Sequence, residues 1–228
     1  VAREYVLQPY RDSIKLQIDY EAELNDAQRT AVTALPGPAL VIAGAGSGKT
    51  RTLTYRVAYL LEQGVPADRI LLLTFTNKAA KEMMGRVADL IGHDMSDLWG
   101  GTFHSIGHRV LRRHAEDLGF DRSFTIQDRE ETKGLVNACI AEAEIDVKAT
   151  RFPKPEVVAD MGSLAVNKQM GVREVIEERF PWFEHLVPQI EGVIQRYAER
   201  KRAQGLMDFD DLLVLWLKLL KEHEEVRE

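Results

Sequence analysis

The sequence predicts an α/β fold with a parallel sheet, joined to an all-helical segment. As far as His104, short apolar runs that stop at turns alternate with helical patterns, and this alternation is typical of parallel strands joined by helices. Beyond His104, helical patterns with polar breaks continue until about Gly205. The 228 residues, 45% hydrophobic and 29% charged, suffice for one large domain or two small ones with a sizeable core.

The first sheet element that we predict is a buried strand over Ala39–Ala43, an apolar run that ends at a glycine-rich turn. Residues 1–20 before it alternate loosely, as a short edge strand does, and carry no recognisable chemistry. The predicted elements that follow are a helix through Leu53–Leu61 that stops at Gly64 and Pro66, a strand Ile70–Leu73, a helix Lys78–Ile91 and a strand Leu98–Phe103.

The helical segment has its own start and stop signals. Asp128 and Glu131 have the spacing of a capping box, which predicts a helix from there through Ala143. Shorter helices are punctuated by Pro153, Gly171, Pro181 and Pro188. A last helix is predicted over Phe209–Leu220, with a broad apolar face and Asp208 as its cap.

Composition limits the class of protein. No run of eighteen apolar residues occurs, so we predict a soluble cytoplasmic chain without membrane contact. Cys139 is the single cysteine, which excludes an internal disulfide and predicts a buried apolar role. The net charge of −6 does not favour nucleic-acid binding, so any such contact must be local. Two basic groups, read here as solvated helix faces, are His108, Arg109, Arg112, Arg113 and His114, and Arg196, Arg200, Lys201 and Arg202.

The glycine-rich turn carries the strongest chemical signal. Its residues are Ala43, Gly44, Ala45, Gly46, Ser47, Gly48, Lys49 and Thr50, a phosphate-binding pattern in which Ala43 replaces the usual first glycine. Backbone N–H groups of such a loop converge on phosphate, and the following helix adds its positive N-terminal end. Lys49 would reach the β- and γ-phosphates, and the Thr50 hydroxyl would bind Mg²⁺.

Polar residues on either side of this turn extend the prediction. Upstream, the Gln28 amide can donate to and accept from an adenine edge, while Asn25 is placed to cap the same helix; both roles can hold together. Downstream, Phe75, Thr76 and Asn77 follow a predicted strand, and ligands of open α/β sheets bind at that edge.

Five blocks in order resemble superfamily 1 DNA helicases of the UvrD/Rep/PcrA kind. Leu24–Gln28 is similar to the family's Q motif, Ala43–Thr50 to its motif I, and Thr74–Met83 to its motif Ia; Gly101–Ser105 and Asp208–Leu212 are similar to two later blocks. The resemblance implies a RecA-like P-loop NTPase domain over 21–107, an inserted helical subdomain over 108–206, and a return to the motor domain over 207–228, after an N-terminal extension over 1–20.

The resemblance also implies roles for single residues. ATP and Mg²⁺ would be bound by Gln28, the loop Ala43–Thr50 and Arg51, with Lys49 catalytic and Thr50 the metal ligand. DNA would be bound by Phe75, Thr76, Asn77, Thr102, His104 and Ser105. Phe75 would stack on a base, which is indifferent to sequence; its alternative is a core aromatic. The alternative for His104 and Ser105 is helix capping.

Hydrolysis needs a carboxylate pair at the end of an apolar strand, and no such Asp-Glu pair occurs here. We therefore expect an N-terminal fragment that ends before the family's acidic Walker B motif and is inactive alone. The parent protein is expected to be an ATP-dependent helicase that moves 3′-to-5′ along single-stranded DNA and acts on single/double-strand junctions, with accessory repair or replication proteins as further candidate partners. The alternatives are the ATPase part of a helicase–nuclease complex, a P-loop kinase, and a non-hydrolysing DNA-binding module.

Overall fold

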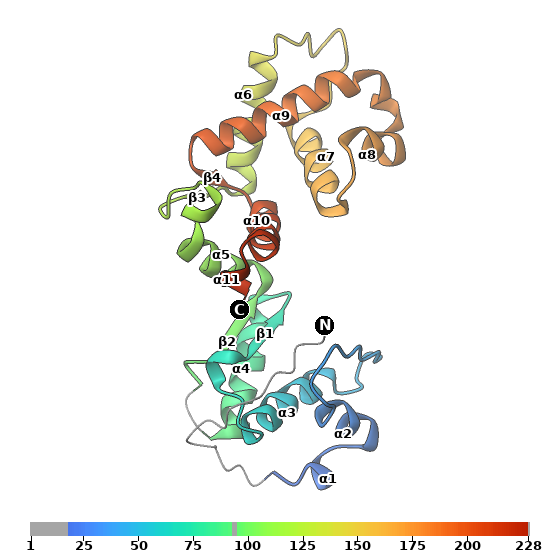
Figure 1. Ribbon diagram of the computed structural model, residues 1–228. Helices are drawn as coiled ribbons and strands as arrows, with labels where there is room; N and C mark the ends of the chain where they lie inside the picture. Colours follow the sequence, from blue (N-terminus) through green and yellow to red (C-terminus); the bar gives the residue numbers. More distant parts are fainter. Residues whose placement is uncertain (1–17, 93–94, 228) are drawn as a thin grey trace, which may run out of the picture. The chain divides into compact units, whose positions relative to one another are not determined.

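A computed structural model describes residues 18–92 and 95–227 (Figure 1). These residues form two compact units, one up to Ile106 and one from Gly107 onward. The edge strand expected before Tyr20 lies almost wholly outside the described residues. None of the described helices is long and apolar enough to cross a membrane.

The first unit combines helices with a small parallel sheet. Its elements are α1 (Tyr20–Glu23), α2 (Asp26–Val32), α3 (Lys49–Glu62), the 3₁₀ helix η1 (Ala67–Arg69), β1 (Leu71–Thr74), α4 (Asn77–Ile91), β2 (Trp99–Thr102) and the start of α5 (Phe103–His114). Strands β1 and β2 pair in parallel, in a register that runs from Leu71 opposite Trp99 to Thr74 opposite Thr102. The strands predicted over 70–73 and 98–103 and the helix over 78–91 are therefore confirmed.

The core of the first unit lies between α3, α4 and the sheet. Val57 and Leu61 of α3 meet Val87 and Ile91 of α4 and Leu72 of β1 in one buried cluster. These positions recur every three or four residues along each helix, so one face of the helix is apolar. Full burial of each such side chain contributes about 1.5–3 kcal/mol, and this packing fixes the ends of β1 and α3 from which the candidate site residues project.

The buried strand predicted over Ala39–Ala43 is wrong. Among residues 18–92 and 95–227 this run has no strand partner, and the side chains of Leu40 and Ile42 are 87% and 91% exposed. Extended backbone needs a neighbour that satisfies its N–H and C=O groups, and the β1–β2 pair does not include the run. The apolar residues of this run favour a strand, but they do not show whether a neighbouring strand is present to pair with it.

The second unit is mainly helical. It contains most of α5, the 3₁₀ helix η2 (Glu116–Leu118), β3 (Thr125–Ile126), α6 (Arg129–Glu142), α7 (Pro155–Lys168), α8 (Val172–Arg179), the 3₁₀ helix η3 (Pro181–Leu186), α9 (Val187–Ala203), β4 (Leu206–Met207), α10 (Phe209–Glu222) and α11 (Glu224–Arg227). The capping boxes at Asp128 and Asp208 are both present. The parallel pair β3–β4 was missed, because two residues per strand leave no readable alternation.

Two buried clusters hold the second unit together. One joins α6, α7, α8 and α9 through Cys139, Met161, Ile176 and Ile190, and burial raises the pKa of the Cys139 thiol. The other joins α5 and α10 through residues that include Leu111 and Leu212. The buried, apolar role expected of Cys139 is confirmed.

A charged network fastens the end of α9 to the start of α10. The Lys201 ammonium lies 2.5 Å from a carboxylate oxygen of Asp208 and 2.6 Å from one of Asp211, and the Tyr197 hydroxyl donates to Asp208 at 2.8 Å. Burial is the largest single influence on Asp208 and opposes its ionisation, but the Lys201 charge and the hydrogen bonds from Lys201, the Asp211 N–H and Tyr197 together outweigh it and lower the pKa of Asp208. Burial raises the pKa of Asp211. That residues 207–228 return to the motor domain stays a prediction.

Candidate nucleotide and nucleic-acid site

The glycine-rich loop leads directly into α3. Gly48 is the residue before the helix and has φ +83°, and Gly46 has φ +77°; this left-handed region is open to glycine and costly for other residues. The first four N–H groups of a helix have no partner within it, so this end carries partial positive charge. The loop therefore presents an electropositive backbone, as phosphate binding requires.

Lys49 lies over the loop that precedes it. Its ammonium donates to the backbone carbonyl oxygens of Ala43 at 3.1 Å and Gly44 at 2.7 Å, while the Ser47 hydroxyl donates to the same Gly44 oxygen at 2.8 Å. Both side chains are exposed, as is Thr50. An anion that entered the loop could therefore exchange these carbonyl contacts of Lys49 for contacts with its own oxygens.

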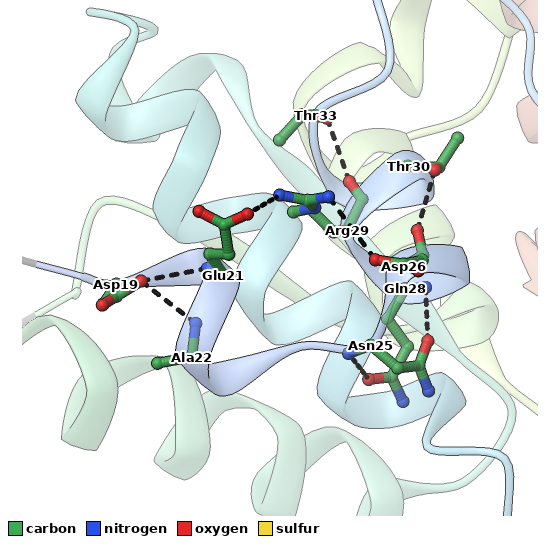
Figure 2. A network of polar contacts seen from close by, with 9 residues as sticks. All are labelled: Asp19, Glu21, Ala22, Asn25, Asp26, Gln28, Arg29, Thr30 and Thr33. Atoms are coloured by element: carbon green, nitrogen blue, oxygen red, sulfur yellow. Dashed lines mark hydrogen bonds and ion pairs between the residues drawn. The ribbon is translucent and has the colours of Figure 1, made fainter.

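Gln28 connects α2 to this loop. Figure 2 shows the reciprocal pair at the start of α2: the Gln28 N–H donates to the Asn25 side chain at 2.9 Å, and the Asn25 N–H donates to the Gln28 side chain at 3.3 Å. The Gln28 side-chain nitrogen in turn donates to the Ser47 carbonyl oxygen at 3.0 Å. The predicted Asn25 cap is confirmed. A contact of Gln28 with adenine stays a prediction, and the observed contact is with the loop backbone.

Ion pairs hold α1 and α2 in position beside the loop. Arg29 of α2 lies 2.8 Å from a carboxylate oxygen of Glu21 and 3.4 Å from one of Asp26 (Figure 2). The Asp19 side chain accepts from the first N–H groups of α1. The carboxylates are largely exposed and Arg29 is partly buried, with 39% of its side chain exposed; ion pairs so open to solvent contribute little each. Their effect is to orient the short helix that carries Gln28.

Arg51, one turn into α3, is held by Glu23 and Tyr55. Its guanidinium donates to a Glu23 carboxylate oxygen at 2.5 Å, to the Glu23 carbonyl oxygen at 2.9 Å and to the Tyr55 hydroxyl at 3.1 Å. Burial, together with the hydrogen bond to Glu23, raises the pKa of Tyr55. The predicted nucleotide contact of Arg51 would therefore have to compete with an existing carboxylate.

The carboxyl ends of β1 and β2 bring a second set of residues together. Thr74 and Thr102 are opposite one another in the sheet, so Phe75 and Phe103, which come next, are neighbours, with ring centroids 5.6 Å apart and planes inclined by 37°. The Phe75 side chain is 88% exposed, which contradicts the alternative of a core aromatic. Phe103 was missed, although it follows its strand as Phe75 follows β1.

Polar residues at this edge of the sheet form hydrogen bonds at the N-termini of α4 and α5. The Thr76 hydroxyl accepts from the Ala79 N–H at 3.1 Å and so caps α4, which begins at Asn77. Thr102 is 6% exposed; its hydroxyl accepts from the Ser105 N–H at 3.1 Å, and the Ser105 hydroxyl donates to the Thr102 carbonyl oxygen at 2.9 Å. These bonds fix the start of α5. DNA contacts of the predicted set, including His104, stay predictions.

The two basic groups have structural partners within the second unit. Arg112 donates to His108 at 2.9 Å and to the carbonyl of Arg122, and burial together with the Arg112 charge lowers the pKa of His108. In the other group, Arg200 pairs with Glu142, Lys201 with Asp208 and Asp211, and Arg202 with the Leu118 carbonyl. These contacts account for the positions of Arg112, Arg200, Lys201 and Arg202 without any nucleic acid.

Comparison with known proteins shows the class, which is that of the helicases. The family model of the UvrD/REP helicase N-terminal domain matches residues 24–228. The chain belongs to this family. That membership sets aside the small-molecule kinase alternative.

The chain is similar to proteins named ATP-dependent DNA helicase PcrA. It is 38% identical to that of Staphylococcus epidermidis over 206 residues, which cover 90% of this chain and 27% of the relative. It is 38% identical to that of Leuconostoc citreum over 205 residues (89% and 27%), and 37% identical to that of Staphylococcus aureus over 206 residues (90% and 27%). The chain thus spans about a quarter of the length of these relatives, 27% in each case.

Proposed function

We propose that this chain is the ATP-binding N-terminal part of an ATP-dependent DNA helicase that moves along single-stranded DNA and unwinds duplex DNA in repair or replication. Family membership and the names of the relatives support the class and the ATP dependence. The proposal includes a RecA-like domain over 21–107, an inserted helical subdomain over 108–206, and substrates with single/double-strand junctions. The 3′-to-5′ direction rests on the sequence resemblance alone.

One observation carries the nucleotide part of the proposal: Gln28, Gly48 and Lys49 all help to fix the conformation of one short loop. Gln28 binds the Ser47 carbonyl oxygen, Gly48 places that loop at the start of α3 in a left-handed conformation, and Lys49 lies over the loop backbone. A solvated turn with an unrelated lysine would need none of these contacts. Together they support a preformed phosphate site.

The residues present suit Mg²⁺ bound with the nucleotide. Thr50 is exposed at the first turn of α3, and a hydroxyl oxygen is the kind of ligand that Mg²⁺ accepts beside phosphate and water. The ion would neutralise charge on the β- and γ-phosphate oxygens. Lys49 would bind those oxygens from the loop side, and the N–H groups of the loop and of α3 would hold the phosphate chain in place.

The DNA part of the proposal depends on the carboxyl edge of the sheet. Phe75 offers an exposed ring for stacking on a base. The N-terminus of α4 begins at Asn77, two residues further on, and a helix N-terminus suits a DNA phosphate. Stacking does not read sequence, which suits a protein that must move along any strand. Both sites belong to the first unit, so nucleotide and DNA would bind the same compact body.

Titration calorimetry with Mg²⁺·ATP and Mg²⁺·ADP tests the nucleotide site. Lys49→Ala removes a charged donor to the phosphates and should weaken binding roughly 10- to 100-fold. The exposed Lys81 of α4 provides the matched control, because Lys81→Ala makes the same change of charge away from the loop. Equal affinities for the chain with Lys49→Ala and the chain with Lys81→Ala would refute the assignment of the loop.

Hydrolysis is expected to need residues beyond those described. Strands β1 and β2 end in Thr74 and Thr102, so neither supplies the acidic pair that orients an attacking water. We expect the 228-residue chain to bind nucleotide without sustained DNA-stimulated turnover in a phosphate-release assay. Robust turnover that Lys49→Ala abolishes would show that the chain contains a complete catalytic site.

A further inference from the structure

Phe103 is the aromatic partner of the exposed Phe75 ring, and it has no role in the function proposed above. The ring centroids lie 5.6 Å apart and the planes are inclined by 37°. Phe75 is 88% exposed and Phe103 37% exposed, so Phe103 contacts Phe75 and leaves most of it open.

The backbone beneath Phe103 is fixed more firmly than an exposed ring requires. Thr102 occupies the last position of β2, opposite Thr74 of β1. Its hydroxyl and carbonyl both bond to Ser105 across Phe103, and α5 begins at Phe103 itself. The strand end, the hydrogen-bonded pair and the helix start together set where the Phe103 ring can lie.

The spacing of the two rings excludes a base between them. A base stacked on both sides would need ring planes about 7 Å apart, two carbon contact distances of about 3.5 Å. The observed 5.6 Å is the separation of two rings that contact each other directly. In this arrangement a base can therefore stack only on the part of the Phe75 ring that Phe103 leaves open.

We propose that Phe103 is a positioning residue: its contact holds the Phe75 ring in one orientation, in which a base of single-stranded DNA stacks on the open part of that ring. The inference rests on the proposed function, since it concerns the same DNA site. Phe103 acts through Phe75 by restricting the rotation of an otherwise free ring. A ring that is already ordered loses less conformational entropy when DNA binds, so the affinity for DNA is higher.

A double-mutant cycle on the full 228-residue chain tests this inference. The probe is a fluorescent oligothymidylate, and its dissociation constant is measured by anisotropy at several salt concentrations. Phe75→Ala should weaken binding roughly 5- to 150-fold, the loss of one base–aromatic stack. Phe103→Ala should weaken it roughly 2- to 10-fold, the effect of one aromatic pair, and should add nothing when Phe75 is already alanine.

Further variants separate positioning from folding. Phe103→Tyr keeps the ring and should restore wild-type affinity, whereas Phe103→Leu keeps the apolar volume, loses the ring and should behave as alanine does. Neither should change the slope of affinity against salt, which reports phosphate contacts. In ¹³C-phenylalanine-labelled chain, oligothymidylate should shift the Phe75 ring signals upfield, and Phe103→Leu should reduce that shift. If Phe103→Ala does not fold, Phe103→Leu provides the same comparison.

The outcomes distinguish the inference from the proposed function. Wild-type chain that does not bind oligothymidylate at any salt concentration overturns the DNA part of the proposed function and this inference with it. Wild-type binding that Phe103→Leu leaves unchanged overturns the inference alone. So does a Phe103 effect of the same size with Phe75 and with alanine at position 75, because a purely structural role would not depend on that ring.

Discussion

The two units differ in where they place their apolar side chains. In the second unit Val187 and Ile190 are fully buried, and Trp182, at 63%, is the most exposed of its large apolar residues within the described part of the chain. In the first unit Leu40, Ile42 and Phe75 are each more than 85% exposed, at 87%, 91% and 88%. The large apolar side chains of the second unit are thus less exposed than the most exposed ones of the first unit.

This difference in exposure suggests that the first unit provides the binding residues and the second unit mainly provides stability. Residues that meet a ligand or a neighbouring strand gain by staying uncovered, and regions with few buried contacts open more easily. The candidate site residues Gln28, Lys49 and Phe75 all lie in the first unit. The second unit holds buried clusters and a buried charge network, so substitutions there should change stability more than binding.

The largest effect is expected at Lys201. Lys201→Met leaves Asp208 and Asp211, whose side chains are only 15% and 24% exposed, without their counter-ion. This should lower the free energy of unfolding of the second unit by up to about 3–5 kcal/mol, the cost of breaking a fully buried pair. Hydrogen exchange of α9 and α10 amides against denaturant measures this change. The matched control is Lys218→Met, which removes only an exposed partner of Glu222 at 3.9 Å and should cost less than about 1 kcal/mol.

The Lys201→Met variant should also respond to pH in a defined direction. Burial raises the pKa of the Asp211 carboxyl group. Without Lys201, Asp208 keeps only the hydrogen bonds from the Asp211 N–H and the Tyr197 hydroxyl against the effect of burial, so its pKa should rise as well. A folded-state pKa above the unfolded value means that the folded state binds more protons in that window. The stability lost by the variant should therefore be smallest near about pH 4 and grow as the pH rises past the unfolded carboxyl pKa. A loss that is constant with pH would argue against two unpaired carboxylates.

A matched pair of isoleucines tests the comparison itself. Ile190→Ala empties a fully buried position in the second unit and should cost about 2–5 kcal/mol. Ile42→Ala changes a side chain that is 91% exposed and should cost no more than about 0.5 kcal/mol. Chemical denaturation followed by unit-specific hydrogen exchange gives both values. Similar costs at the two positions would mean that the 39–43 run is packed in solution.

Local rules predicted much of the fold from the sequence. Helices α4, α6 and α10 were predicted from apolar spacing and from caps at Asp128 and Asp208, signals that lie within a few residues of one another. The run Ala39–Ala43 was predicted wrongly, because a strand depends on a partner that local sequence does not identify. The β3–β4 pair was missed because its residues are about eighty positions apart in the chain, as Thr125 and Leu206 show.

For the candidate site, too, the sequence predicted the local features but not the contacts between separate elements. Asn25 as a cap and the glycine-rich turn before a helix follow from local spacing. The bond from Gln28 to the Ser47 carbonyl oxygen and the contact between Phe75 and Phe103 do not. Both depend on how separate elements pack, and the register of β1 with β2 is what brings the two phenylalanines together.

The smallest effect is expected at Gly48, where the first unit is tightly constrained. A Cβ added there would lie 2.5 Å from the Gln28 side-chain nitrogen, at φ +83°. Gly48→Ala should therefore cost roughly 1–2 kcal/mol and break the bond from Gln28 to the loop. Hydrogen exchange of α2 and the start of α3 measures the cost, and calorimetry with Mg²⁺·ATP should show weaker binding.

Gly44→Ala is the control for this prediction, because its added Cβ meets no heavy atom within 4 Å and its φ is not positive. It should leave the exchange of α2 unchanged. If both alanines raised α2 exchange equally, the bond from Gln28 to the loop would not be what couples α2 to α3. If only Gly48→Ala does so, the proposed phosphate site is built at a tightly constrained point of the first unit, although apolar residues only a few positions earlier stay exposed.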